Sequence, residues 1–370
     1  MMMNKFRFVL TQQPLALSSF QNWLKLIIKH PTINFKYIPR ALLVSFLTFL
    51  TIPLKIVEHI RFREQIKNIA ITQEPIFILG HWRSGTTHLH NLMSMDENFG
   101  YVSTFQGFAP GFFLSKGKFI KTLVGLMLPH TRPMDKVQIS IDYPQEEEFA
   151  LANISPLSFY HGWYFPKNMQ QYFDDFVLFK GIPQEIRERW KRAYLSIVKK
   201  ATISENKRLL LKSPTNTARI KILLEIFPNA KFIHIYRNPY NVYSSTKRLY
   251  DSILPVFGFQ TIEEKDIEAN ILYFYKETMQ KFLQEKHLIP KSNLVEVKYE
   301  DLEAEPLTEL ARIYEELNLA GFDSAKERFT GYLNDKKAYK KNKHILSDKT
   351  VDKISQEWSF TIDLWDYDLP

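Results

Sequence analysis

The stretch from Ile76 to Thr87, IFILGHWRSGTT, constrains the fold of this chain more than any other. Its first four residues are apolar, which predicts a buried strand, and the run from Gly80 to Gly85 predicts a tight turn into a helix. The two glycines have the spacing of a phosphate-binding loop, whose backbone N–H groups converge on an anion at the positive end of the following helix. The unit predicted here is therefore strand, anion-binding loop and helix.

The loop differs from that of a nucleoside triphosphatase at the positions that follow Gly85. Thr86 and Thr87 occupy the places where the usual motif has Lys and then Ser or Thr, and the nearest cation is Arg83, inside the loop. Without that Lys, a nucleoside triphosphate loses its contact to the β- and γ-phosphates. The loop therefore suits a shorter anionic group, and a P-loop kinase or NTPase variant is kept only as an alternative.

Two later segments repeat the pattern of a strand followed by a helix. Residues 208–212 (RLLLK) and 231–236 (KFIHIY) predict strands, and this alternation predicts a parallel sheet with helices on its faces. Lys212 and Arg237 stand just after the last apolar residues of these strands, as Arg83 stands in the loop after the first. Ligands of such folds gather at the carboxyl ends of the strands. We therefore expect three cations at one rim of the sheet.

Composition limits the classes of function. A chain of 370 residues that is 45% hydrophobic can bury a full core, and we expect one large domain with insertions. The sequence has no cysteine, which excludes disulfides and thiolate nucleophiles and fits a reducing, cytoplasmic compartment. The net charge of +9 favours an anionic ligand or an anionic membrane surface. Nucleic acid ranks low because the basic residues are spread along the chain and no nucleic-acid-reading module is recognisable.

No metal site is predicted. His88 and His90, in the helix expected after the loop, stand two residues apart and so point to different helix faces.

The N-terminal part contains one almost wholly apolar run, from Ala41 to Leu54. It is shorter than the roughly 20 residues that a membrane span needs. A helix packed under the sheet is the preferred interpretation, and a helix that dips into a membrane interface is the alternative. The apolar run in residues 1–17 is short and broken, unlike that of a signal peptide. We expect a cytoplasmic protein, with peripheral membrane contact through residues 41–54 as the alternative.

Aromatic residues are dense between residues 99 and 165, where we expect an aromatic-rich insertion that covers an acceptor site. Glu146, Glu147 and Glu148 begin a predicted helix in this region, and the helix dipole stabilises acids at that end. The same acidic cluster suits a general base, for which Glu146 and Glu148 are the preferred candidates. Three histidines in predicted loops are weaker candidates for that role: His81, His130 and His161.

The C-terminal segment, residues 321–370, contains a run of lysines: Lys336, Lys337, Lys340, Lys341 and Lys343. Such a run is usually exposed to solvent, and here we also expect it to close over a polyanionic cofactor. The expected organisation is a single domain over residues 1–370. It comprises an N-terminal helical segment (1–70), a core (75–320) and this basic segment.

Three segments in this order, GHWRSGTT, LLLKSPTNTARIKILLEIFPNAKFIHIYRNPYNVYSS and VKYEDL, resemble sulfotransferases that use 3′-phosphoadenosine 5′-phosphosulfate (PAPS). The resemblance is strongest to the bacterial group related to tyrosylprotein sulfotransferases, and it covers residues 75–320. It implies an α/β fold with a P-loop-like parallel sheet flanked by helices. It also implies PAPS as the co-substrate, a hydroxyl group as the sulfuryl acceptor, and no metal.

The resemblance assigns roles to the residues that match its motifs. The loop would bind the 5′-phosphosulfate through Arg83, Ser84, Gly85, Thr86 and Thr87. The third expected strand and the helix after it would bind the 3′-phosphate, through Arg237 and Ser245, and Tyr299 of the YEDL segment would lie near the nucleotide. Lys212 is similar to the lysine that stabilises charge on the transferring group, and Arg83 is expected to assist it.

The acceptor is less constrained. Tyrosylprotein sulfotransferases carry their base in a G-E-E segment after the first helix, where this chain has Val102, Ser103 and Thr104, so neither the base nor a protein-tyrosine acceptor carries over. An aromatic-rich cover favours a flat apolar alcohol or phenol, such as a sterol, a bile acid or a lipid. A carbohydrate acceptor and a non-catalytic anion- or membrane-binding protein are the remaining alternatives. The sequence does not predict the oligomeric state.

Overall fold

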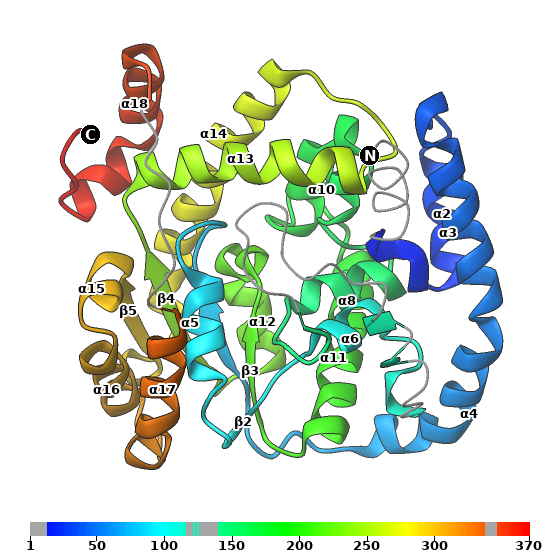
Figure 1. The fold of residues 1–370 in the computed structure, drawn as a ribbon, viewed down its shortest axis with the longest axis horizontal. Helices are drawn as coiled ribbons and strands as arrows, with labels where there is room; N and C mark the ends of the chain where they lie inside the picture. Colours follow the sequence, from blue (N-terminus) through cyan, green and yellow to red (C-terminus); the bar gives the residue numbers. More distant parts are fainter. Residues whose placement is uncertain (1–12, 116–120, 123, 126–139, 337–345) are drawn as a thin grey trace. The chain divides into compact units, whose positions relative to one another are not determined.

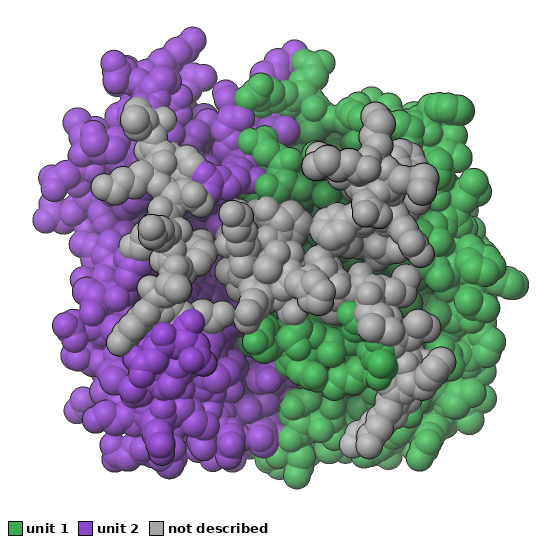
Figure 2. All heavy atoms as spheres, in the orientation of Figure 1, with its two compact units in different colours: residues 1–72, 102–206, 249–264 green, residues 73–101, 207–248, 265–370 purple. Residues whose placement is uncertain are grey.

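The computed structural model describes residues 13–115, 121–122, 124–125, 140–336 and 346–370 (Figure 1). The chain divides into two compact units, and neither is one continuous stretch (Figure 2). Unit 1 comprises residues 1–72, 102–206 and 249–264, and unit 2 comprises residues 73–101, 207–248 and 265–370. All residues that the sequence predicts to bind the nucleotide belong to unit 2.

Unit 2 is built on a five-stranded parallel sheet with the strand order β2-β3-β1-β4-β5. The strands are β1 (Ile76–Leu79), β2 (Phe99–Gly100), β3 (Arg208–Lys212), β4 (Lys231–Tyr236) and β5 (Leu294–Lys298). The central strand β1 pairs with β3 and β4, so that Phe77 stands opposite Leu211 on one side and Phe232 on the other. The predicted α/β fold with a parallel sheet is confirmed, and three predicted strands have the expected bounds.

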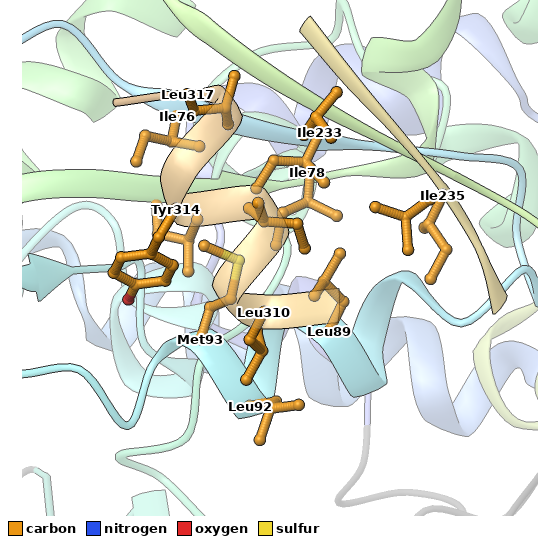
Figure 3. Close-up of a cluster of buried hydrophobic side chains, with 14 of the residues drawn as sticks. Ile76, Ile78, Leu89, Leu92, Met93, Ile233, Ile235, Leu310, Tyr314 and Leu317 are labelled. Atoms are coloured by element: carbon orange, nitrogen blue, oxygen red, sulfur yellow. The ribbon is translucent and has the colours of Figure 1, made fainter. Parts of the chain in front are cut away.

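Helices cover both faces of this sheet, and its strands are therefore buried on both sides. The helices that lie wholly or largely in unit 2 are α5 (Thr86–Met93), α12 (Ile220–Ile226), α14 (Glu264–Glu285), α15 (Tyr299–Ala304), α16 (Pro306–Glu316), α17 (Phe322–Lys336) and α18 (Asp348–Leu364), and α13 (Pro239–Phe257) begins in unit 2 and continues into unit 1 after Arg248. On one face, Ile76 and Ile78 pack with Leu89 of α5 and Leu310 of α16 (Figure 3). On the other face, Phe227 at the end of α12 lies against Phe77 and Phe282 of α14 stacks on His234. The alternation of faces follows the two-residue period of a strand.

Unit 1 is helical. Its helices are α2 (Phe20–Lys29), α3 (Ile38–Leu50), α4 (Ile52–Asn68), α6 (Thr104–Phe108), α8 (Glu147–Ile154), α9 (His161–Tyr164), α10 (Met169–Phe176) and α11 (Gln184–Glu205). The rings of the aromatic-rich region are mostly buried, and Tyr160 stacks on Trp163 with 3.9 Å between the ring centroids. Aromatic packing therefore supplies much of the core of unit 1.

The apolar run at residues 41–54 differs from the preferred expectation of one buried helix. It is divided between α3 and α4, which meet at Thr51 and form a pair bent by 40°. Leu42 and Phe46 of α3 are 65% and 61% exposed, so the expectation of burial under the sheet is wrong for this side of the helix. Among the described residues, no single helix is long and apolar enough to cross a membrane. The helices of residues 35–50 and 52–68 are together long and apolar enough to do so as a bent pair, by length and composition only.

Candidate active site

The loop between β1 and α5 has a conformation that requires both of its glycines. Gly80 has φ +143°, and a Cβ atom there would lie 2.4 Å from the carbonyl oxygen of Ile235 in β4. Gly85 has φ +99°, and a Cβ atom there would lie 2.3 Å from Cδ2 of Tyr299. These positive φ values and close approaches are tolerated only without a side chain. The loop therefore passes tightly against β4 and the start of α15.

Two further features fix the loop and present its donors. The N–H group of Gly80 donates to Oγ1 of Thr217, 2.8 Å away, in the segment after β3. Gly85 is the N-cap of α5, whose first backbone N–H groups have no intrahelical acceptors. Ser84 and Thr86 are buried beside it. The sequence therefore builds a helix N-terminus suited to an anion at the carboxyl end of β1.

The side chain of Arg83 turns toward α13. Arg83 has φ +72°, a left-handed conformation that is strained for a residue with a side chain. Its Nε donates to Oγ of Ser245 at 2.8 Å, and its carbonyl oxygen accepts from a guanidinium nitrogen of Arg237 at 3.3 Å. The predicted 3′-phosphate residues, Arg237 and Ser245, are thus both hydrogen-bonded to the loop residue Arg83.

Tyr299 joins this group through its ring. The guanidinium carbon of Arg237 lies 4.2 Å from the centroid of that ring, a cation–π contact. The hydroxyl of Tyr299 donates to Oε1 of Glu303 at 3.0 Å, one turn along α15. The same ring leaves no room for a side chain at Gly85. Tyr299 therefore positions both the loop and the arginine that the sequence predicts for the 3′-phosphate.

Lys212, the last residue of β3, lies at the start of α5. Its Nζ donates to Oγ1 of Thr87 at 3.3 Å, and the residue is buried. The neighbouring His90 accordingly resists protonation. Burial, and then the positive charge of Lys212, lower the pKa of His90 to about 3. The three strand-end cations are therefore associated with the same loop and helix, Lys212 through Thr87 and Arg237 through Arg83.

One hydrogen-bonded chain begins at Asn238, the residue after Arg237, and was not predicted from the sequence. The side-chain oxygen of Asn238 accepts from the N–H groups of Tyr240 and Asn241 at the start of α13. The N–H of Asn238 donates to one carboxylate oxygen of Glu300 at 3.2 Å, and the hydroxyl of Tyr367 donates to the other at 2.8 Å. Asn before Pro at a helix start is a capping signal that would have identified Asn238. Nothing in the sequence pattern links Glu300 to Tyr367.

The acidic cluster lies in unit 1, at the start of α8, where each carboxylate has an internal donor. Oε2 of Glu146 accepts from the hydroxyl of Tyr160, and Oε1 of Glu147 accepts from the hydroxyl of Tyr194 at 2.7 Å. Oε1 of Glu148 accepts from the hydroxyl of Ser158 at 2.7 Å and from the N–H of Phe159 at 3.0 Å. Glu146 is 9% exposed, whereas Glu147 and Glu148 are fully buried.

The histidines proposed as weaker base candidates are buried where they are described. His161 begins α9 and is not in a loop, contrary to the expectation, and its Nε2 lies 2.9 Å from the carbonyl oxygen of Ser155. Burial lowers the pKa of His161 to about 4 and that of His81 to about 3, which keeps both imidazoles neutral at pH 7. His130 lies outside the described residues, as do Lys337, Lys340, Lys341 and Lys343 of the C-terminal run.

Within the part of the chain that the structure describes, no group of three or more His, Asp or Glu side chains is placed to hold a metal ion.

Comparison with known proteins extends the resemblance to most of the chain. The model of the family described as "Sulfotransferase family" matches residues 75–324. Omega-hydroxy-beta-dihydromenaquinone-9 sulfotransferase Stf3, from Mycobacterium bovis and from Mycobacterium tuberculosis, is 32% identical over 351 residues, which are 95% of this chain and 90% of the relative.

Solved structures show the same fold. Sulfotransferase STF9 from Mycobacterium avium is similar with a TM-score of 0.68 and 14% identity, over 95% of this chain and 98% of the other. Sulfotransferase STF1 from Mycobacterium tuberculosis has a TM-score of 0.61 and 16% identity, over 92% and 90%. At these identities the likeness concerns the fold alone.

Proposed function

The chain belongs to the sulfotransferase family, and from that premise we propose that it transfers a sulfuryl group from PAPS to the hydroxyl of an apolar, lipid-like acceptor. The observation that carries the donor assignment is the group formed by Arg83, Ser245, Arg237 and Tyr299 beside the glycine loop. Two guanidinium groups and a hydroxyl suit a phosphate monoester. The loop without a Lys after Gly85 suits the 5′-phosphosulfate.

The proposed reaction is an in-line substitution at sulfur. The acceptor oxygen forms a bond to sulfur while the bond from sulfur to the 5′-phosphate oxygen breaks, the hydroxyl proton passes to a general base, and 3′-phosphoadenosine 5′-phosphate (PAP) leaves. Charge spreads over the peripheral oxygens, so fixed positive groups and N–H donors should supply most of the stabilisation. We assign this role to Lys212 and the first N–H groups of α5. The hydrogen bond of Arg83 to Ser245 supports a role for its side chain at the 3′-phosphate.

The acceptor class is proposed from two sources. The relatives that are 32% identical over nearly the whole chain are named for a hydroxylated menaquinone derivative, an apolar alcohol. The aromatic-rich region of unit 1 is compatible with such an acceptor. We further propose that the enzyme is cytoplasmic and meets this acceptor at a membrane, with residues 41–54 in peripheral contact. No observation favours a carbohydrate acceptor.

The donor assignment is tested by the melting temperature of the purified protein with PAP and with ATP, both without Mg²⁺. A ligand that binds the folded state at 100 times its Kd stabilises it by about 2.7 kcal/mol. We expect PAP to raise the melting temperature and ATP to leave it nearly unchanged. Arg237→Ala should abolish the PAP effect, because charge-assisted hydrogen bonds to the 3′-phosphate are lost.

Arg189→Ala, which removes an exposed arginine on α11, is the matched control and should retain the full shift. An equal shift with ATP would contradict the donor assignment. A PAP shift that persists in Arg237→Ala would remove Arg237 from the site.

The general base is proposed to be Glu146, because it keeps some exposure while Glu147 and Glu148 are fully buried. Glu146→Gln should lower kcat on the order of a hundredfold, within the usual range for loss of a general base, with a smaller loss of stability than at Glu148, because only the Tyr160 hydroxyl loses an ionised acceptor. Glu148→Gln should instead lower the free energy of unfolding by about 1–3 kcal/mol, because Ser158 and Phe159 lose an ionised acceptor. Steady-state rates and urea unfolding of both variants distinguish these roles. A large loss of kcat in Glu148→Gln, with a large loss of stability in Glu146→Gln, would make Glu148 the base and Glu146 the structural residue.

A further inference from the structure

Three consecutive helices of unit 1 carry exposed apolar side chains, which we call the N-terminal apolar face. Its members are 39% to 87% exposed: Leu24 and Ile28 of α2, Phe35, then Ile38, Leu42, Phe46, Phe49 and Leu50 of α3, and Ile56, Val57 and Ile60 of α4. Elsewhere in the described residues, large apolar side chains with comparable exposure are few and scattered: Tyr143, Leu288, Leu364 and Leu369. A concentration of this kind marks an interaction surface.

The spacing along α3 places these residues on one side of the helix. Ile38, Leu42 and Phe46 follow one another at four-residue intervals, which is one face of an α-helix. The opposite side is buried, with Ala41 and Val44 packed into unit 1. The helix is therefore apolar on both sides, and only one side is used in folding.

Hydrogen bonds hold α3 in this orientation. The guanidinium group of the buried Arg40 donates to the carbonyl oxygens of Gly258 and, at 3.0 Å, Pro255. The indole N–H of Trp23 in α2 donates to Oγ of Ser45 at 2.8 Å. In Figure 1, α2 and α3 (blue) run beside each other, so the two helices present the face as one fixed surface. A preformed surface of this kind needs little ordering on binding.

Charge around the face has one predominant sign. Exposed cations flank it on α2, on α4 and on the segment between α2 and α3: Lys25, Lys36, Arg61, Arg63 and Lys67. Residues 20–68 contain only two carboxylates, those of Glu58 and Glu64. Glu58 is buried and paired with Lys200, which leaves Glu64 as the exposed acid. An apolar surface with a basic rim complements a bilayer that contains anionic lipids.

We propose that the N-terminal apolar face docks on an anionic lipid bilayer, with α3 and the start of α4 lying in the interface between headgroups and acyl chains. The structure favours a position in the interface over a span across the membrane. α3 has only 13 residues, α3 and α4 are bent relative to each other, and one side of α3 is buried in unit 1. Docking extends the proposed function by bringing the enzyme to an acceptor dissolved in the bilayer. The docking itself does not depend on sulfuryl transfer.

Flotation with vesicles tests the proposal without nucleotide or acceptor. The full chain is expected to float with phosphatidylglycerol–phosphatidylcholine vesicles and much less with pure phosphatidylcholine. Leu42→Glu combined with Phe46→Glu should lower the partition coefficient at least about tenfold, because two large apolar side chains no longer enter the bilayer. Arg61→Glu combined with Arg63→Glu should weaken binding only to the anionic vesicles. Leu364→Glu, at a similarly exposed apolar residue on α18, should bind like the unsubstituted protein.

Three measurements separate a failure of membrane docking from misfolding, from self-association and from a failure of the proposed function. Thermal unfolding checks that each variant is folded, and Leu42→Ser combined with Phe46→Ser replaces the charged pair if it is not. Light scattering detects the rival occupant, a second copy of this chain. A dimer that the apolar-face substitutions convert to monomer, without vesicle binding by the parent, would overturn the proposal. Sulfation of a water-soluble phenol reports on the proposed function separately, and its absence would leave the docking result standing.

Discussion

Replacement of Lys212 by alanine should lower kcat about a hundredfold to a thousandfold, the effect of removing one donor from a site that stabilises developing charge. Lys212 ends β3, is buried, and lies 3.3 Å from Oγ1 of Thr87 at the start of α5. Its ammonium group therefore belongs to the same helix terminus as the loop expected to hold the phosphosulfate. Because charge on the transferring oxygens changes most in the transition state, the loss should appear in kcat more than in the Kd of PAP.

The measurement is the initial rate with saturating PAPS and a soluble phenol, together with calorimetric titration of PAP. Lys207→Ala removes an exposed lysine just before the other end of β3 and serves as the matched control, with kcat expected to be unchanged. An unchanged kcat in Lys212→Ala would contradict the role of Lys212 in stabilising charge on the transferring group. A weaker affinity for PAP at normal kcat would make Lys212 a nucleotide-binding residue only.

Gly85→Ala should abolish detectable PAP binding. The φ angle of +99° costs about 1–3 kcal/mol once a side chain is present. In addition, the new Cβ atom would lie 2.3 Å from the ring of Tyr299, so either the loop or the ring must move. Movement of the ring would remove the support of Arg237, and movement of the loop would misdirect the N–H groups of α5. Both routes damage the predicted nucleotide site.

Gly181→Ala provides a matched control for backbone strain. Gly181 has φ +63°, and a Cβ atom there would meet nothing within 4 Å. This variant should lose some stability and still bind PAP with the parent affinity by calorimetry. Gly85→Ala that binds PAP normally would show that the loop tolerates a side chain, against the geometry described above.

The strands of the sheet could largely be predicted from the sequence, for a physical reason. β1, β3 and β4 are short apolar runs that end at Gly, Ser-Pro or Asn-Pro sequences, and a parallel sheet buries such runs on both faces. β2 was missed because it has only two residues, Phe99 and Gly100, too few for any periodicity. Its pairing with β3 depends on tertiary context that no local pattern encodes.

Site residues could be predicted from the sequence where their position at the end of a strand determines their role. They could not be predicted where the role depends on a contact with a residue far away in the sequence. The rule that ligands gather at strand ends identified Lys212 and Arg237. The hydrogen bond from Arg83 to Ser245 joins residues far apart in the sequence, and nothing local specifies it. The internal donors to Glu148 are likewise invisible in a helix-start pattern. The run at 41–54 was misread because apolar spacing alone does not distinguish a side chain buried in protein from one left exposed.

The strand order also has a consequence for synthesis on the ribosome. β1 emerges first, yet both of its neighbours, β3 and β4, follow it only after residues 102–206 of unit 1 have been made. At roughly 5–20 residues per second, the apolar segment Ile76–Leu79 waits on the order of ten seconds without a partner strand. Unit 1 is itself incomplete until residues 249–264 appear. The nascent chain therefore carries its central strand unpaired through much of translation.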